Sequence, residues 1–142
     1  MQSYSFTLAL RFWHPDLAPD EIPSELCIFN SHGWKAGESR ITPKGTPLHG
    51  IHRESYWHAD LVAEWIHSSA TEPEALILEL LNRLAPHATF VRHLIFSGGR
   101  GLIQLNSHSS ENYAIVLPSE LLSQCSLLGL SFAHDVYPTE QA

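Results

Sequence analysis

Hydrophobic and polar residues alternate along the first strand-like stretch of the chain. One side of this stretch would carry Tyr4, Phe6, Leu8, Leu10 and Phe12, and the other side Ser5, Thr7, Ala9, Arg11 and Trp13. Period-two alternation over ten residues is typical of an antiparallel strand with one buried face. The pattern therefore predicts a strand over residues 4–13, ended by His14-Pro15-Asp16.

Helical spacing replaces this alternation in three places. The clearest helix follows Thr71, which we predict as its N-cap in a capping box with Glu74, and ends at Pro86. Its apolar stripe consists of Leu76, Ile77, Leu80, Leu81 and Leu84. A short helix is expected from Pro19, with Ile22 and Leu26 on its inner face, and another over residues 119–128, ended by Gly129.

The remaining apolar runs predict further strands. They cover residues 55–63, 89–96, 102–106 and 130–137, with a short strand over 113–117. The segments 89–96 and 102–106 would form a hairpin through the glycine-rich turn 97–101. Residues 30–53 predict a long irregular segment with one short strand near 34–40. This order of elements indicates an α+β fold, in which one globular domain (1–142) has a mostly antiparallel sheet with helices packed on one face.

The charge distribution narrows the function classes. The formal net charge is −7, and Lys35, Arg40, Lys44 and Arg53 supply half of the eight basic residues. Residues 54–82 contain no Lys or Arg and six acids, namely Glu54, Asp60, Glu64, Glu72, Glu74 and Glu79. Such a surface repels phosphate backbones, so we expect no nucleic-acid partner. It would attract a basic protein, although a negative charge that merely maintains solubility is the alternative.

The sequence contains no segment typical of a membrane-spanning helix or of a secretion signal. The longest apolar runs fall short of the roughly 18 residues that a spanning helix needs, and the first residues lack a basic segment before an apolar one. We therefore expect a cytoplasmic protein without a membrane partner. Cys27 and Cys125 both fall on apolar stretches and are expected to be buried, reduced thiols, with a disulfide or a reactive thiol as alternatives.

Histidines are the most conspicuous candidate ligands. His49, His52 and His58 could supply three imidazoles to a zinc ion, but Gly50 argues against the helix that would pair the first two. We expect neither a native metal site nor a cofactor. The 97–101 turn precedes a strand rather than a helix, so it does not predict a phosphate loop. His134 and Asp135 are neighbours on a strand and should face opposite ways, with Asp135 bonded to nearby backbone.

Aromatic residues offer candidate binding groups. We expect Trp57 in the core. Trp13 would lie on the strand face opposite the core and Trp34 in the long loop, where each could anchor an interface or pack against that loop.

Several of these features resemble a known bacterial family. They are the final strand Leu130-Ser131-Phe132-Ala133-His134-Asp135-Val136-Tyr137 after Leu127-Leu128-Gly129, together with Gly37-Glu38 and Ser55-Tyr56-Trp57. The chain resembles the family called domain of unknown function 4279 over nearly its whole length. The resemblance implies a small α+β bacterial protein and carries over no catalytic residue.

These observations favour a non-enzymatic protein-binding domain. The sharper hypothesis is an immunity protein that neutralises a bacterial toxin, namely a basic toxin that the acidic residues would recognise. The expected partner-binding residues are Trp34, Glu54, Asp60, Glu64, Glu72 and Glu74. The alternative is a metal-dependent or small-molecule enzyme that uses the His49–His58 loop, and either a monomer or a homodimer is compatible with the sequence.

Overall fold

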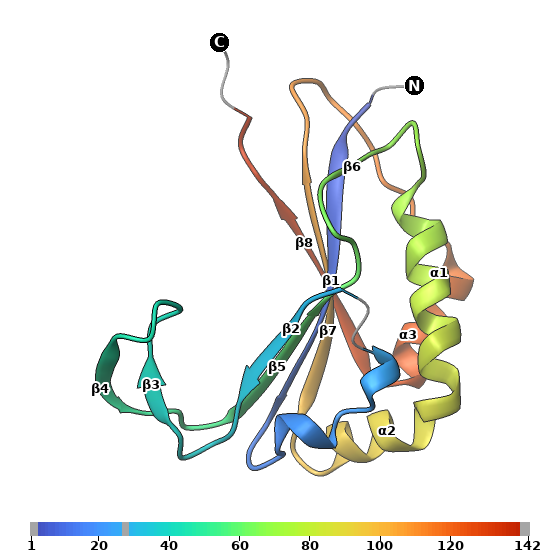
Figure 1. The fold of residues 1–142 in the computed structure, drawn as a ribbon. Helices are drawn as coiled ribbons and strands as arrows, with labels where there is room; N and C mark the ends of the chain where they lie inside the picture. Colours follow the sequence, from blue (N-terminus) through green and yellow to red (C-terminus); the bar gives the residue numbers. More distant parts are fainter. Residues whose placement is uncertain (1–2, 27–28, 140–142) are drawn as a thin grey trace.

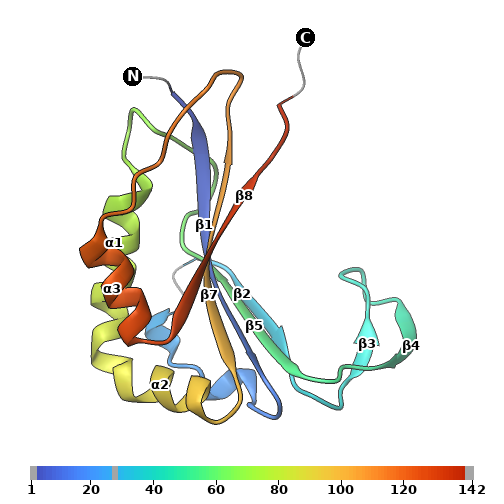
Figure 2. The same ribbon diagram turned by 180° about the vertical axis from the view of Figure 1, so that it is seen from behind.

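A mostly antiparallel sheet carries helices on one of its two faces (Figures 1 and 2). The computed structural model describes residues 3–26 and 29–139. The strands are β1 Ser5–His14, β2 Ser31–Trp34, β3 Ser39–Ile41, β4 Pro47–Ile51, β5 Ser55–Asp60, β6 Ile66–His67, β7 Arg100–His108 and β8 Leu130–Val136. The helices are α1 Pro73–Leu84, α2 Ala88–Phe96 and α3 Ser119–Leu127, with 3-10 turns at Pro19–Glu21, Ser24–Leu26 and Ala85–His87. The predicted α+β architecture is confirmed.

The first strand lies at the centre of the main sheet. The strand order is β2-β5-β1-β7-β8, and β6 pairs with β1 beyond the end of β5. All of these pairs are antiparallel except β7 and β8, which run parallel because α3 connects them in a crossover. The strands β3 and β4 form a separate two-stranded hairpin.

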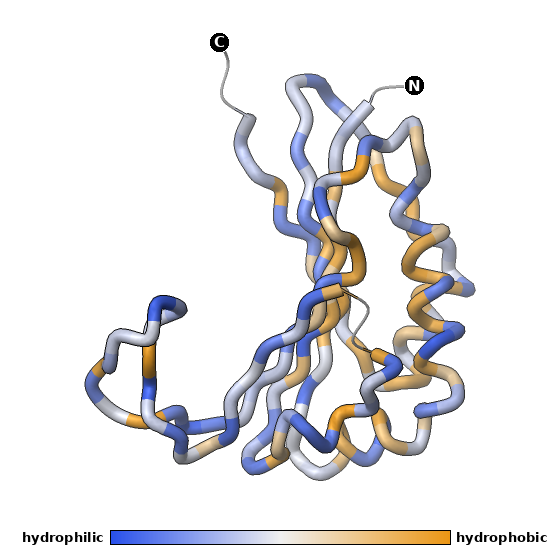
Figure 3. Tube along the Cα trace, viewed as in Figure 1, coloured by the Kyte–Doolittle hydropathy of each residue, from blue (hydrophilic) through white to orange (hydrophobic). Residues whose placement is uncertain are grey.

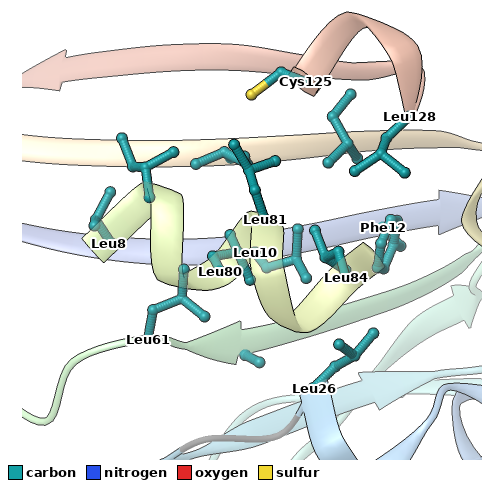
Figure 4. Packing of buried hydrophobic residues seen from close by; sticks show 14 of the residues in the cluster. Leu8, Leu10, Phe12, Leu26, Leu61, Leu80, Leu81, Leu84, Cys125 and Leu128 are labelled. Carbon is teal, nitrogen blue, oxygen red and sulfur yellow. The ribbon is translucent and has the colours of Figure 1, made fainter. Parts of the chain in front are cut away.

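The alternation of β1 is confirmed, since its apolar side chains line the buried face. Phe6, Leu8, Leu10 and Phe12 are almost fully buried. They pack against the apolar stripe of α1, whose buried members are Ile77, Leu80, Leu81 and Leu84 (Figure 4). A fully buried leucine contributes about 1.5–3 kcal/mol relative to an exposed one. This layer between helices and sheet therefore dominates the stability of the fold.

Cys125 on α3 belongs to the same layer. It is a free, buried thiol, as expected, and burial raises its pKa. Cys27 lies outside the described residues.

The segment predicted as the strand 89–96 is instead helix α2. Val91 and Leu94 are buried and Ala88 and Ile95 are partly buried, a spacing of three and four residues that defines one helix face. The short apolar run is rich in β-branched and aromatic residues, and this composition favoured a strand over a helix in the prediction. Packing on the sheet and the helical turn Ala85–His87 before it outweigh that propensity.

The glycine-rich segment 97–101 consequently ends a helix rather than forming a hairpin turn. Ser97 donates its backbone N–H to the carbonyl of His93, and Gly99 donates to that of Leu94. Gly98 has a φ of 106°, which side-chain-bearing residues rarely adopt. The strand expected after it is confirmed as β7.

The start of α1 also differs from the predicted capping box. Glu72, not Thr71, is the N-cap residue, and its side chain makes no capping hydrogen bond. Pro73 occupies the first helical position, where its missing N–H costs nothing. Because the start is displaced by one residue, Thr71 and Glu74 are out of register for reciprocal capping.

Three further predictions are corrected. The short helix at Pro19 is two 3-10 turns separated by Pro23, although Ile22 and Leu26 are buried as expected. Residues 113–117 form no strand and instead cover the core edge, with Tyr113 stacked on Tyr4. The segment 30–53 is not irregular, since it contains β2, β3 and β4.

The hairpin of β3 and β4 projects from the end of β2 and β5, on the side of the sheet away from the helices (Figures 1 and 2). We call residues 35–53 the arm. In the described part of the chain, no helix is long and apolar enough to cross a membrane.

Candidate functional site

The face of the sheet opposite the helices, here called the open face, carries a connected set of polar and aromatic side chains. Strand alternation and the pairing registers place on it Thr7, Arg11, Trp13, His32, Trp34, Tyr56, His58, Asp60, Arg100, Gln104, Asn106 and Asp135. These residues come from five strands. Few of them are free, because most contact one another.

A hydrogen-bonded chain crosses the open face from β1 along β5. Nε of Arg11 donates to the hydroxyl of Tyr56 at 2.8 Å. That hydroxyl lies 3.2 Å from Nδ1 of His58, and Nε2 of His58 lies 2.8 Å from a carboxylate oxygen of Asp60. A carboxylate only accepts, so Nε2 carries the proton and Nδ1 accepts from the tyrosine. The four side chains thereby fix one another's orientation.

Arg11 also links β1 to the other half of the sheet. Its Nη1 donates to Oε1 of Gln104 at 2.7 Å, and Nε2 of Gln104 donates to Asp135 at 2.9 Å. Asp135 therefore bonds a side-chain amide and not the backbone, which corrects the prediction. It faces the open side while His134 faces the helices, as the strand position predicted. A pre-oriented polar surface of this kind loses little conformational entropy on binding.

Aromatic rings and arginines gather at the end of the open face where β1 ends and where β5 and β7 begin. The guanidinium of Arg11 lies 4.9 Å from the ring centroid of Trp13, and that of Arg100 lies 4.7 Å from the same ring. Arg100 also makes a two-pronged ion pair with Glu54, at 3.0 and 3.2 Å. The two arginines thus lie against Trp13, which is half-buried.

Strand β2 adds His32 and Trp34 to this surface. The ring of His32 stacks on His58 at 4.8 Å between centroids, and Trp34 lies 4.7 Å from Tyr56. Partial burial lowers the pKa of His32, and the nearby His58 and Arg11 lower it further, whereas Asp60 raises it. The lowered pKa favours the neutral form of the His32 ring, which suits stacking and hydrogen bonding.

The six residues predicted to bind a partner fall into two groups. Trp34 and Glu54 lie together beside the start of β5, where the indole N–H of Trp34 donates to the carbonyl of Glu54 at 3.1 Å, and Asp60 lies on the open face at the other end of that strand. Glu64, Glu72 and Glu74 lie on the other side, around α1. Glu72 and Glu74 line a cavity of about 410 Å³, and Glu64 lines another of about 430 Å³. The structure does not bring all six onto one surface.

The three histidines proposed as an alternative ligand set are used separately. The carbonyl of His49 accepts from Arg40, His52 stacks on Trp34 at 4.1 Å, and His58 is engaged through both ring nitrogens. No group of three His, Cys, Asp or Glu side chains converges as a metal site within residues 3–26 and 29–139.

A second pair of groups resembles a nucleophile and its base. The hydroxyl of Ser107 lies 2.6 Å from Nε2 of His134 and 2.7 Å from the hydroxyl of Tyr113. Ser107 is 0% exposed, however, and points to the helix side of the sheet. A nucleophile must reach its substrate, and Ser107 is buried. The hydrogen bonds of Ser107, His134 and Tyr113 therefore serve to hold β7, β8 and the 109–118 segment together.

Arg11 and Gln104 were not among the predicted site residues. Each was visible as a polar residue at an outward position of an alternating strand. The missing information was tertiary, because only the strand order places Arg11 between Tyr56 and Gln104.

Comparison with known proteins gives a family without an assigned activity. A family model described as Domain of unknown function (DUF4279) matches residues 3–139, which is nearly the whole chain. No curated protein and no solved structure matches the chain.

Proposed function

The chain belongs to the DUF4279 family, and for this member we propose a non-enzymatic protein-binding function exerted through the open face. The observation that supports the proposal best is the hydrogen-bonded chain of Arg11, Tyr56, His58 and Asp60 on the sheet face opposite the helices. A partner would meet a surface that is already ordered.

The composition of this surface suits a protein partner. Tryptophan, tyrosine and arginine are the residues that most often dominate the binding energy of protein interfaces. The open face presents Trp13, Trp34 and Arg11 together, with Tyr56 beneath them.

The sharper form of the proposal is an immunity protein whose partner is a basic bacterial toxin. The formal net charge of −7 would attract such a partner at long range. At contact, Asp60 would accept hydrogen bonds from a lysine or arginine, since its side chain keeps 41% of its surface exposed. Charge reversal at Asp60 should therefore slow association.

Co-expression tests this function directly. The product of the gene adjacent to the one that encodes this protein is expressed alone and together with it, and growth is followed. The proposal predicts that the neighbour is toxic alone and that co-expression restores growth through a stoichiometric complex. A harmless neighbour that forms no complex would count against the immunity form. Restored growth without any complex would count against a binding mechanism.

A further inference from the structure

The arm is an ordered hairpin that packs against almost nothing. Every residue from Gly37 to Ile51 is exposed except Thr42, which is half-buried. Three of the exposed residues are large and apolar, namely Ile41 (60% exposed), Leu48 (44%) and Ile51 (58%). An isolated two-stranded hairpin is at best marginally stable in water. The exposed apolar residues of the arm therefore suit a contact with a second surface.

The pairing of the hairpin is irregular. Ser39 pairs with Ile51 and Ile41 pairs with Pro47, and a register shift typical of a β-bulge lies between the two pairs. Ile41 and Ile51 therefore lie on different strands of the hairpin, and both are exposed. Figure 3 shows short hydrophobic stretches interrupting an otherwise mostly hydrophilic arm.

The charge of the arm is opposite to that of the rest of the protein. Residues 35–53 contain four basic residues and Glu38 as the one acid, which gives a formal charge of +3. The whole chain carries −7, so the remaining residues carry −10. A basic, apolar arm and an acidic body are complementary to each other.

One cavity of the body has the matching chemistry. It lies between α1 and the segment after β5, has a volume of about 430 Å³, and combines an apolar lining with Glu64, Glu79 and Arg83. The apolar lining residues are Phe29, Leu61, Val62, Ala63, Ile66, Leu76 and Leu80. Phe29 at its rim is 51% exposed.

The arm cannot occupy this cavity in its own chain. The cavity adjoins α1 in the helix layer, whereas the arm extends from the opposite side of the sheet (Figures 1 and 2). An arm that fills the cavity must therefore come from another molecule.

We propose that the arm of one copy docks into this cavity of a second copy, and that the exchange is reciprocal in a two-fold symmetric dimer. Ile41 and Ile51 enter the apolar lining, and Arg40 and Lys44 lie against Glu64 and Glu79. Each copy contributes one arm and one cavity, as a closed two-fold interface requires. The cavity lies on the helix side of the sheet, whereas the arm is attached on the other side, where His52 stacks on Trp34.

A charge-swap experiment tests the contact. One variant carries Arg40→Glu and Lys44→Glu in the arm, and the other carries Glu64→Lys and Glu79→Lys in the cavity. Each variant alone would place like charges against each other, so dimerisation should weaken at least about tenfold. An equimolar mixture restores opposite charges at both arm–cavity contacts and should form a heterodimer. Analytical ultracentrifugation reports the masses, and circular dichroism confirms that each variant folds.

A matched control separates this contact from a general effect of charge. The variant Glu111→Lys with Glu120→Lys makes the same change in net charge at exposed positions outside the cavity. It should dimerise as the wild type does. A wild type that stays monomeric at all concentrations would overturn the proposal. So would a folded pair of swap variants whose mixture remains monomeric, or an arm variant that dimerises as tightly as the wild type.

Discussion

Arg11 on β1 donates a hydrogen bond of 2.8 Å from Nε to the hydroxyl of Tyr56 on β5. Through Nη1 the same guanidinium reaches Gln104 on β7, so one side chain ties together three adjacent strands. The planar fork of arginine donates in two directions at fixed angles, which a lysine cannot do. Arg11 is therefore the residue on which the order of the open face depends most.

Replacing Arg11 should cost more stability than replacing an unengaged basic residue. We expect Arg11→Ala to lower the free energy of unfolding by about 1.5–2 kcal/mol, the lower part of the range for hydrogen bonds to charged groups, because the site is partly solvated. Arg11→Lys should recover little of this loss. Urea unfolding measures the effect, with Lys44→Ala on the exposed arm as the control, for which a change within about 0.5 kcal/mol is expected. Equal losses in the two variants would refute the assigned role of Arg11.

The pKa of His32 should reveal the charges around it. It is lowered in the folded protein by partial burial, and then by His58 and Arg11, while Asp60 raises it. Removing the charge of Asp60 and that of Arg11 in separate variants should reveal their opposite effects on this pKa. NMR titration of the His32 ring should show a lower pKa in Asp60→Asn and a higher pKa in Arg11→Gln. Shifts in the reverse directions would contradict the arrangement of the open face.

The same shift sets the sign of a pH effect on stability. A histidine whose pKa is lower in the folded state than in the unfolded state binds more protons when unfolded, so its contribution to stability is lost as pH falls. The loss should begin near the ordinary value of 6.5 and be complete below the lowered pKa. Unfolding curves from pH 8 to pH 5 should be flatter for His32→Gln than for the wild type. An identical pH dependence would show that His32 does not contribute.

Ser107 should matter for stability rather than for chemistry. Ser107→Ala leaves His134 and Tyr113 without their shared buried partner, so we expect a loss of about 1–3 kcal/mol in the free energy of unfolding. Thermal or urea unfolding measures it, and Ser126→Ala on the exposed side of α3 is the control. A Ser107→Ala protein as stable as this control would show that the trio is not structural.

Gly33 should control the attachment of the arm. A Cβ at this position would collide with the backbone carbonyl of Tyr56 and approach Trp57 and Pro19. Gly33→Ala should therefore loosen β2 from β5 and separate Trp34 from Tyr56. Amide hydrogen exchange should accelerate in β2, whereas Gly45→Ala, at a turn with open space, should affect only the arm tip. Unchanged protection of β2 would contradict this view.

The sequence pattern correctly predicted the elements that bury a single face. It failed where tertiary packing determines whether a segment is a helix or a strand. The alternation of β1 and the stripe of α1 survive as predicted, because each describes one buried face of a regular element. The run 89–96 is too short for its period to be decisive, and its packing after Ala85–His87 makes it a helix. The Glu72 N-cap follows from Pro73 at the first helical position, a signal that the sequence contains and that the capping-box pattern outweighed in the prediction.

The candidate site was predictable only in part. Of the residues predicted to bind a partner, Trp34 and Glu54 contact each other and Asp60 lies at the far end of the same sheet face, but Glu64, Glu72 and Glu74 belong to another surface. The content of acidic residues does not distinguish the open face from the surface around α1. Residues close in sequence separate in space here, because the chain leaves the sheet after β5 and then enters α1. The links from Arg11 to Tyr56 and Gln104 span 45 and 93 residues, and only the strand order reveals them.

The most direct test of the central claim compares the two acidic surfaces in one binding measurement. Calorimetric titration with the product of the adjacent gene would be performed on the wild type, on Asp60→Lys, and on Glu72→Lys with Glu74→Lys. If the open face is the binding surface, Asp60→Lys should weaken the complex at least about tenfold while the α1 variant binds nearly as the wild type does. A complex that is lost in the α1 variant and unchanged in Asp60→Lys would contradict the account.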